Sequence, residues 1–397
     1  MLMPFINSIL HNDLYKFSMS NYYIQNFPEA SGTFTFHDRN DTEYDEMFVR
    51  ILKDELSHLS KLFLQKNEFD WAVKNIPYIP QFYWEWLRSF RYEPNKINIW
   101  LDESKHLHIE VTDKMYKVTF YEIPILATVS ALYHVYKHHG YQLKQEIEEA
   151  LISGLDRKIE IAKEHNLFFA DFGMRRAYNP LTEEFVVKYL KENCPTFVGT
   201  STVSLAMKYD VKPIGTMAHE CFMFQAAIHS PKDANFMVME NWVKVYDGNL
   251  GTVLTDTYTV DTFLRNFSMK LAKLYDGVRH DSGDPFTFGN KIIWKYKSYG
   301  IDPMSKTIVF SDSLDFEKAA EIKEYFAGKI KTTFGIGTNL TCDFPGIKPL
   351  NIVMKLKECR VNDRQPVYGC VKLSDVPSKS IGTPEDIENY KYQLNIK

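Results

Sequence analysis

Cysteine is scarce in this sequence, and the cysteines that are present follow no metal or disulfide pattern. The chain has 397 residues and only five cysteines, which are scattered and include no Cys-x-x-Cys pair. Small secreted domains use dense cysteines, and structural zinc sites use closely spaced pairs. The scarcity therefore argues against a disulfide framework and against a structural zinc, and it predicts reduced thiols in a cytoplasmic protein.

Long apolar runs are also missing. The longest stretch without Asp, Glu, Lys or Arg covers residues 123–136, is shorter than the ~20 residues that cross a bilayer, and contains Pro124. The N-terminal segment MLMPFINSILHND lacks the basic start and the small-residue cleavage site of a signal peptide. We therefore expect no membrane span, no export and a cytoplasmic location.

An excess of positive charge is the third absence. Lys and Arg number 47 against 51 for Asp and Glu, so the formal net charge is −4, which argues against a nucleic-acid partner. What is present is ordinary globular composition, with 45% hydrophobic and 15% aromatic residues. At about 100 to 200 residues per domain, this length allows two or three domains.

The two ends of the chain predict one α+β domain. Residues 1–125 mix strand-like and helical patterns, and alternation over residues 31–37 places Phe34 and Phe36 on one face of a predicted strand. Residues 346–397 predict a C-terminal β-hairpin, made from 351–357 and 366–373, that packs back on the N-terminal domain.

Residues 126–345 predict an α/β barrel domain. Helical spacing over residues 133–166 predicts one long amphipathic helix, and a repeated pattern of short apolar strand, Gly-rich or polar turn and helix follows it. Alternating strands and helices favour a parallel sheet, which we expect to form a barrel. The predicted strands cover residues 167–171, 195–198, 213–216, 275–279, 307–310 and 332–336.

Polar motifs follow these strands, at the edge where α/β proteins bind ligands. The segment 279–285, Arg-His-Asp-Ser-Gly-Asp-Pro, combines a cation, an imidazole and two carboxylates in one strand-to-turn transition. Structural caps rarely need four ionisable groups, whereas a site for a sugar and a phosphate does. The segment 171–176, Asp-Phe-Gly-Met-Arg-Arg, adds an aromatic face and two guanidiniums, so we interpret both segments as ligand-binding.

Three further motifs have structural alternatives. The glycines in Gly335-Ile-Gly-Thr-Asn339 allow backbone N–H groups to approach a phosphate, although such turns commonly hold no ligand. Asp312 precedes a predicted helix over residues 314–326 and is equally typical of an N-cap. His219 begins another predicted helix, where Glu220 could accept from the imidazole, although a lone histidine is usually structural.

Taken in order, these motifs resemble those of the bacterial-type nicotinate phosphoribosyltransferases, and the resemblance covers nearly the whole chain. The matching segments are His11–Lys16, Asp171–Arg176, Gly199–Val203, Gly215–Glu220, Arg279–Pro285, Phe310–Asp312 and Phe334–Thr338. The resemblance implies an α/β fold, namely the irregular barrel of the type II phosphoribosyltransferases joined to an α+β domain formed by both chain ends. It also implies a homodimer with an active site shared between subunits.

The resemblance further assigns roles to individual residues. Phe172 and Tyr15, the latter from the partner subunit, would enclose the pyridine ring, while Arg175 and Arg279 would face the phosphates and the nicotinate carboxylate. His219 would become phosphorylated by ATP. The remaining implied residues bind the ribose hydroxyls and the 5-phosphate: Asp281 and Asp312, and Gly335 and Gly337.

The implied reaction is attack of nicotinate on phosphoribosyl pyrophosphate, assisted by Mg²⁺ and coupled to ATP hydrolysis, in NAD salvage. Ser201 stands where the related nicotinamide enzymes carry an aspartate, and we expect its hydroxyl to donate to the nicotinate carboxylate. Two alternatives stay open. One is transfer to nicotinamide or quinolinate on the same scaffold, and the other is a barrel-shaped binding protein without turnover.

Overall fold

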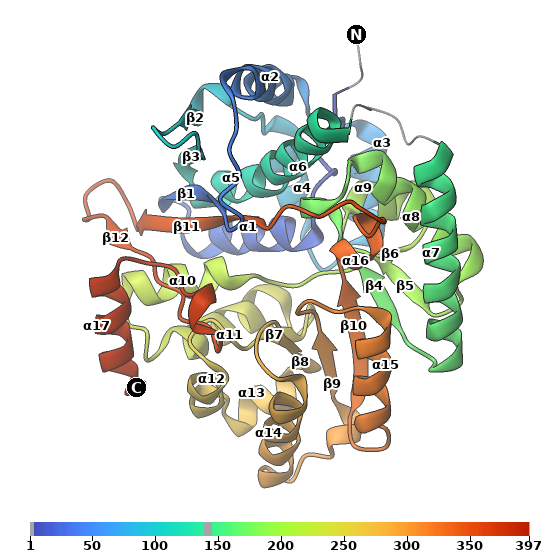
Figure 1. The fold of residues 1–397 in the computed structure, drawn as a ribbon. Coiled ribbons are helices and arrows are strands. Elements are labelled where there is room, and N and C mark those ends of the chain that lie inside the picture. Colours follow the sequence, from blue (N-terminus) through green and yellow to red (C-terminus); the bar gives the residue numbers. More distant parts are fainter. Residues whose placement is uncertain (1–3, 139–144, 397) are drawn as a thin grey trace.

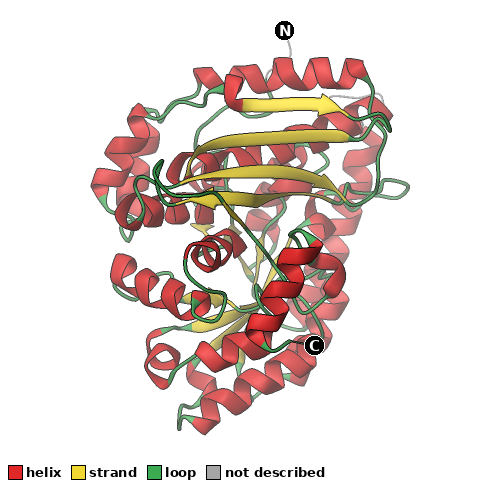
Figure 2. Ribbon diagram, turned by 90° about the vertical axis from the view of Figure 1, so that its left-hand side faces the viewer, coloured by secondary structure: helices red, strands yellow, loops and turns green. Residues whose placement is uncertain are grey.

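Two separate β-sheets form the framework of the molecule (Figures 1 and 2). The computed structural model describes residues 4–138 and 145–396. A parallel sheet has the strand order β6-β5-β4-β10-β9-β8-β7 and curls into a half barrel, and an antiparallel sheet has the order β12-β11-β1-β3-β2. The predicted α/β fold class, with a second unit built from both chain ends, is therefore confirmed.

The parallel sheet consists of β4 Phe169–Asp171, β5 Phe197–Thr200, β6 Lys212–Pro213, β7 Thr252–Leu254, β8 Gly277–His280, β9 Thr307–Phe310 and β10 Lys331–Ile336. The antiparallel sheet consists of β1 Ser31–Asp38, β2 Ile97–Leu101, β3 Leu107–Lys114, β11 Ile352–Arg360 and β12 Tyr368–Gly369. Within it, β11 pairs with both β1 and β12, so the C-terminal hairpin packs on the N-terminal strands as predicted. Buried apolar side chains from both sheets belong to one continuous core.

Helices cover the outside of the parallel sheet and flank the antiparallel one (Figure 1). They are α1 Leu14–Asn26, α2 Glu46–Ser57, α3 Lys66–Asn75, α4 Gln81–Ser89, α5 Met115–Val118, α6 Glu122–His138, α7 Gln145–Glu164, α8 Pro180–Asn193, α9 Val203–Tyr209, α10 His219–Ile228, α11 Ala234–Tyr246, α12 Val260–Asn266, α13 Met269–Leu274, α14 Pro285–Ser298, α15 Phe316–Tyr325, α16 Thr338–Thr341 and α17 Pro384–Leu394.

Local chemistry explains several of these helix starts. Asn179 accepts a hydrogen bond from the backbone N–H of Thr182 and is followed by Pro180 at the first helical position of α8. The side chain of Asp284 caps α14 in the same way, again followed by a proline. The α14 cap lies four residues beyond the end of β8, so the polar motif between them is held by regular structure on both sides.

The prediction of one helix over residues 133–166 is wrong. The structure has two helices, α6 and α7, which run in different directions (Figure 1), and the part of the predicted helix at residues 139–144 lies outside the described residues. The predicted boundary after residue 125 falls inside α6, and the division into domains stays a prediction. Strand β7 was not predicted, because three residues are too short to show a period.

One helical stretch of the described residues, Met115–Tyr136, is long and apolar enough to cross a membrane by length and composition alone. However, 89% of its most apolar window is buried inside the protein. A membrane-spanning helix would present such a surface to lipid. The stretch is therefore a core helix, and its burial is consistent with the expected absence of a membrane span.

Candidate active site

A cavity of about 310 Å³ lies between the carboxyl ends of the parallel strands and the antiparallel sheet. Phe172, Arg279 and Gly335 contribute from the parallel sheet, whereas Phe34 and Lys355 contribute from β1 and β11. Every site residue named from the sequence lines this one cavity: Tyr15, Phe172, Arg175, Ser201, His219, Arg279, Asp281, Asp312, Gly335 and Gly337. The structure thus brings together side chains that are more than 300 residues apart in the chain.

Three aromatic rings line the cavity, those of Tyr15, Phe34 and Phe172, and the resemblance assigned two of them, Tyr15 and Phe172, to the pyridine ring. The resemblance implied that Tyr15 comes from a partner subunit, but the structure places the tyrosine of the same chain there. The backbone explains this placement, because the N–H of Leu14 donates to the carbonyl of Ser201 over 2.8 Å, and Asp13 forms a bridge with Thr202. The start of α1 is thereby fastened to the end of β5.

Gly335 is required by packing against the Phe172 ring. A Cβ atom at Gly335 would lie 2.3 Å from Cε2 of Phe172, which is far inside van der Waals contact. The backbone N–H of Phe172 also donates to the carbonyl of Ile336 over 2.8 Å. The glycine therefore lets this ring pack closely against β10, a reason that the sequence pattern did not reveal.

Arg279 and Asp281 form a rigid pair at the end of β8. The Arg279 guanidinium donates from Nη2 to Oδ1 of Asp281 over 2.9 Å and from Nε to the hydroxyl of Ser311 over 2.8 Å. Its Cζ lies 5.9 Å from the centre of the Phe172 ring. The pKa of Asp281 lies well below its usual range, because the charge of Arg279 and the hydrogen bond with His219 outweigh the opposing effect of burial.

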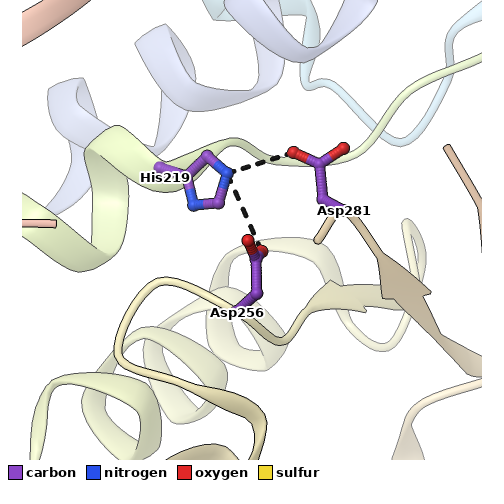
Figure 3. A group of neighbouring side chains, drawn as sticks. All are labelled: His219, Asp256 and Asp281. Carbon is purple, nitrogen blue, oxygen red and sulfur yellow. Dashed lines mark hydrogen bonds and ion pairs between the residues drawn. The ribbon is translucent and has the colours of Figure 1, made fainter. Parts of the chain in front are cut away.

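His219 starts α10 and is buried among charged groups (Figure 3). Its Nε2 lies 3.1 Å from Oδ2 of Asp281, 3.8 Å from Oδ1 of Asp256 and 3.1 Å from Nζ of Lys372. Its Nδ1 forms a hydrogen bond of 3.0 Å with the hydroxyl of Thr257. Burial, assisted by the Lys372 charge, lowers the pKa of His219 to about 4, so the imidazole is neutral near pH 7.

Two expectations about neighbouring groups are wrong. Glu220 does not accept from His219; its Oε2 pairs instead with Nζ of Lys16 over 2.7 Å. In the segment after β8, Asp284 is the cap of α14, and the His280 ring packs against Phe288 rather than lining the cavity. Of the four ionisable groups in residues 279–285, Arg279 and Asp281 therefore face the cavity, and the other two are structural.

Ser201 is engaged by a carboxylate of the protein itself. Its hydroxyl donates to Oδ1 of Asp13 over 2.7 Å, and both residues are buried. Burial raises the pKa of Asp13, against the lowering effects of Arg175 and of this hydrogen bond. The hydroxyl proton of Ser201 is thus already committed, and the expected donation to a substrate carboxylate would require this hydrogen bond to rearrange.

Asp312 lines the cavity and does not cap a helix. The cap of α15 is Asp315, which accepts from the N–H of Lys318, whereas Oδ1 of Asp312 accepts from Nζ of Lys379 over 2.6 Å. This resolves the alternative left open by the sequence. A carboxylate paired with a lysine at a strand end is suited to bind sugar hydroxyls next to an anion.

Sequence reasoning missed a group of cations that line the cavity. Arg39 comes from the loop after β1 and Lys355 lies on β11, whereas Arg176, which also lines the cavity, belongs to the segment 171–176 already interpreted as ligand-binding. Lys372 and Lys379 come from the C-terminal segment, which the sequence analysis treated as a hairpin only. Its lysines followed no motif, so no local signal distinguished them from surface lysines.

Three of these cations have no carboxylate partner. Among the described residues, no ion pair within 4 Å involves Arg39, Arg176 or Lys355. Burial lowers the pKa of Lys355 to about 7 and that of Arg176 to about 10, the latter with help from the nearby Arg175 and Arg39 charges. Arg176 donates to the backbone carbonyl of Ile352 over 3.0 Å, and clustered cations without carboxylate partners are suited to bind a polyanion.

The fold and the cavity together define a class of protein. It is a half-barrel α/β protein whose cavity combines three aromatic rings, a neutral buried histidine and cations without carboxylate partners among the described residues. Aromatic faces beside positive charge are suited to a flat ring and an anionic group.

Comparisons with known proteins define the family. The model of the nicotinate phosphoribosyltransferase family matches residues 167–397, and its N-terminal domain model matches residues 10–130. The crystal structure of nicotinate phosphoribosyltransferase from Porphyromonas gingivalis is 42% identical, has a TM-score of 0.95, and aligns over 98% of this chain and 100% of that chain. The chain belongs to the nicotinate phosphoribosyltransferase family.

More distant relatives agree. The nicotinate phosphoribosyltransferase of Chromohalobacter salexigens is 39% identical over 393 residues, which is 98% of each chain. The structure of nicotinate phosphoribosyltransferase from Vibrio cholerae is 31% identical with a TM-score of 0.91, and covers 100% of this chain and 96% of that chain. The likeness therefore extends over both sheets and the cavity between them.

Proposed function

We propose that this protein forms nicotinate mononucleotide and pyrophosphate from nicotinate and phosphoribosyl pyrophosphate, as a cytoplasmic ATP-dependent ligase of NAD salvage. The observation that supports the proposal most directly is the cavity wall itself. The rings of Tyr15, Phe34 and Phe172 lie in the same cavity as the cations Arg39, Arg176 and Lys355, which have no carboxylate partner among the described residues. A pyridine carboxylate and a polyphosphate together match this composition.

The pyridine would lie between Tyr15 and Phe172, with its carboxylate toward Arg175. Stacking on aromatic faces suits a flat heterocycle, and a guanidinium binds a carboxylate with two parallel hydrogen bonds. Arg175 lies 3.7 Å from Glu122, measured from Nη1 to Oε1, and keeps donors available beyond that loose contact. Its charge is secured, because nearby acidic groups keep its pKa above the usual value.

The sugar phosphate would extend from the rings along the strand ends. Asp281 and Asp312 would accept from the ribose hydroxyls, while the backbone near Gly335 and Gly337 would donate to the 5-phosphate. Arg279, held at a fixed angle by Asp281 and Ser311, would face the phosphates. The unpaired cations would lie against the pyrophosphate.

The transfer step needs alignment more than acid or base chemistry. The lone pair of the pyridine nitrogen forms the bond to the anomeric carbon, and the bond from that carbon to pyrophosphate breaks with its electron pair leaving on the pyrophosphate oxygen. Positioned cations that stabilise this growing charge lower the barrier. In this cavity Arg279, Arg176, Arg39 and Lys355 would supply that positive charge.

His219 would couple the reaction to ATP. Its neutral imidazole has a lone pair available to attack the γ-phosphorus of ATP, with ADP leaving on the oxygen of the broken bond. Lys372, 3.1 Å from Nε2, would face the phosphate that forms there. The negative charge of this phosphate would change the net charge of the cavity and favour productive substrate binding.

Mg²⁺ fits the carboxylates beside His219. Ligand atoms of His219, Asp256 and Asp281 lie within 4.8 Å of one another, and Oδ1 of Asp256 is buried without a hydrogen-bond partner. Mg²⁺ prefers oxygen ligands, so Asp256 and Asp281 would hold it. The ion would supply positive charge against the phosphates.

We also propose a homodimer. Because Tyr15 of the same chain lines the cavity, the rings of Tyr15 and Phe172 are both present in one subunit. In this proposal, dimerisation is not what supplies the second ring.

The test is to measure pyrophosphate release from phosphoribosyl pyrophosphate with nicotinate, nicotinamide and quinolinate side by side, each with and without ATP. We expect release with nicotinate, stimulated by ATP, and formation of ADP in step with it. Release with nicotinamide or quinolinate alone would contradict the proposed substrate. No release with any of the three would favour a binding protein.

A further inference from the structure

A fully buried lysine lies directly beneath the cavity. The side chain of Lys16 has no exposed surface, and its Nζ lies 2.5 Å from Oε2 of Glu122 and 2.7 Å from Oε2 of Glu220. Burial acts to lower the pKa of Lys16, but the two carboxylates outweigh it and raise the pKa, so the lysine keeps its charge. A fully buried charged side chain is stable only when it is paired.

Each member of this triad belongs to a different part of the site. Lys16 follows Tyr15 in α1, and Glu220 follows His219 in the first turn of α10. Glu122 is the first residue of α6, and its other oxygen, Oε1, lies 3.7 Å from Nη1 of Arg175. The two ion pairs of Lys16 are shielded from solvent and connect the helix turns that carry Tyr15 and His219 to Glu122, whose other oxygen contacts the partly exposed Arg175.

We propose that Lys16 is a positioning residue that holds Arg175 and the first turn of α10 in register with Tyr15. Without its charge, the carboxylates of Glu122 and Glu220 would repel each other, and Arg175 is the nearest remaining cation to Glu122. The guanidinium would then turn away from the cavity and toward these carboxylates. Resting on the proposed function, the same ion pairs would transmit phosphorylation of His219 to the nicotinate site.

The test compares three variants of the full-length protein. Lys16→Met removes the charge, Lys16→Arg keeps it, and Lys306→Met is the matched control. Lys306 is also buried but donates only to the backbone carbonyls of Lys273 and Tyr275, outside the cavity. For Lys16→Met we expect the KM for nicotinate to rise about tenfold or more, with a smaller change in kcat. Lys16→Arg should recover most of the affinity.

A milder variant tests the link to His219 and covers the case in which Lys16→Met does not fold. Glu220→Gln keeps the shape of the side chain and leaves the pair between Lys16 and Glu122 intact. We expect this variant to keep the melting temperature within a few degrees, and to lose most of the ATP-dependent decrease in the KM for nicotinate.

The outcomes separate the two proposals. A KM for nicotinate that is the same in Lys16→Met and Lys306→Met, or an unchanged ATP effect in Glu220→Gln, overturns the role of Lys16. Absence of any ATP-derived phosphate on the wild-type protein contradicts the proposed function instead, and the KM comparison, made without ATP, still decides the role of Lys16.

Discussion

The ammonium group of Lys372 lies 3.1 Å from Nε2 of His219, although 153 residues separate them in the chain. Together with burial, this cation lowers the pKa of the imidazole to about 4. The contact therefore keeps the ring neutral at physiological pH, and it places a positive charge at the atom that faces the carboxylates of Asp281 and Asp256. A neutral nucleophile beside a cation is the arrangement that phosphoryl acceptance needs.

Replacing His219 should uncouple the enzyme without destroying it. We expect His219→Asn to abolish both the acid-labile phosphate label from ATP and ATP hydrolysis. A slow transfer that does not need ATP should persist at high phosphoribosyl pyrophosphate, because the ring-binding and sugar-binding residues are unchanged. Labelling with radioactive ATP checks this, and an unchanged label in the variant would remove His219 from the mechanism.

Replacing Lys372 should make labelling sensitive to pH. With a pKa of about 4, the wild-type imidazole is neutral at both pH 6 and pH 8, so labelling should not fall between pH 8 and pH 6 on account of His219. Lys372→Met removes the lowering charge and leaves the two carboxylates, so the pKa of His219 should rise and labelling at pH 6 should drop relative to pH 8. Lys379→Met, which removes a lysine paired with Asp312, is the control and should keep the flat profile. An equally flat profile in Lys372→Met would show that burial alone sets the pKa.

The geometry of Arg279 should matter as much as its charge. Arg279→Ala should cause a large loss of turnover, and Arg279→Lys should also be poor, because an ammonium cannot hold Asp281 and Ser311 while facing a phosphate. Steady-state kinetics for phosphoribosyl pyrophosphate measure both. Near-normal kcat/KM in the lysine variant would show that only the charge is needed.

A second carboxylate beside Asp13 should suppress nicotinate use. In Ser201→Asp, the introduced carboxylate would lie near the carboxylate of nicotinate. Two like charges ~4 Å apart cost on the order of 4 kcal/mol at an effective dielectric of 20, which is about three decades of affinity for nicotinate. We expect kcat/KM for nicotinate to fall steeply and any gain of nicotinamide use to be small. Ser201→Ala, which removes only the hydrogen bond to Asp13, is the control and should lose less. Equal nicotinate kinetics in the wild type and Ser201→Asp would place this residue away from the substrate carboxylate.

Mixing experiments should reveal which subunit supplies Tyr15. Because Tyr15 and Arg279 of one chain line the same cavity, a hybrid dimer of Tyr15→Ala and Arg279→Ala subunits has no intact site. We therefore expect the mixture, after verified subunit exchange, to show no more activity than its components. Recovery of activity would show that the ring crosses the dimer interface in solution.

The sequence by itself determined which segments of the chain carry the candidate site residues. Apolar strands followed by polar turns predicted the parallel sheet and its ligand-binding edge, and every residue to which the resemblance assigned a role lines the cavity. This succeeded because the carboxyl ends of parallel strands meet at one edge whatever the details of packing. The shortest strands were less predictable. The three residues of β7 are too few to show a period, so this strand could not be found from the sequence.

Only the tertiary structure decided which groups meet. Neighbouring residues on a helix point in different directions. In α10, Glu220 therefore contacts Lys16, while His219 contacts Asp281 at the end of β8. Likewise Lys372, on a C-terminal segment without a motif, reaches His219 because the pairing of β11 with β1 brings that segment back to the cavity. Local sequence carries periodicity and caps, whereas the partner of a buried charge is set by whichever distant element packs against it.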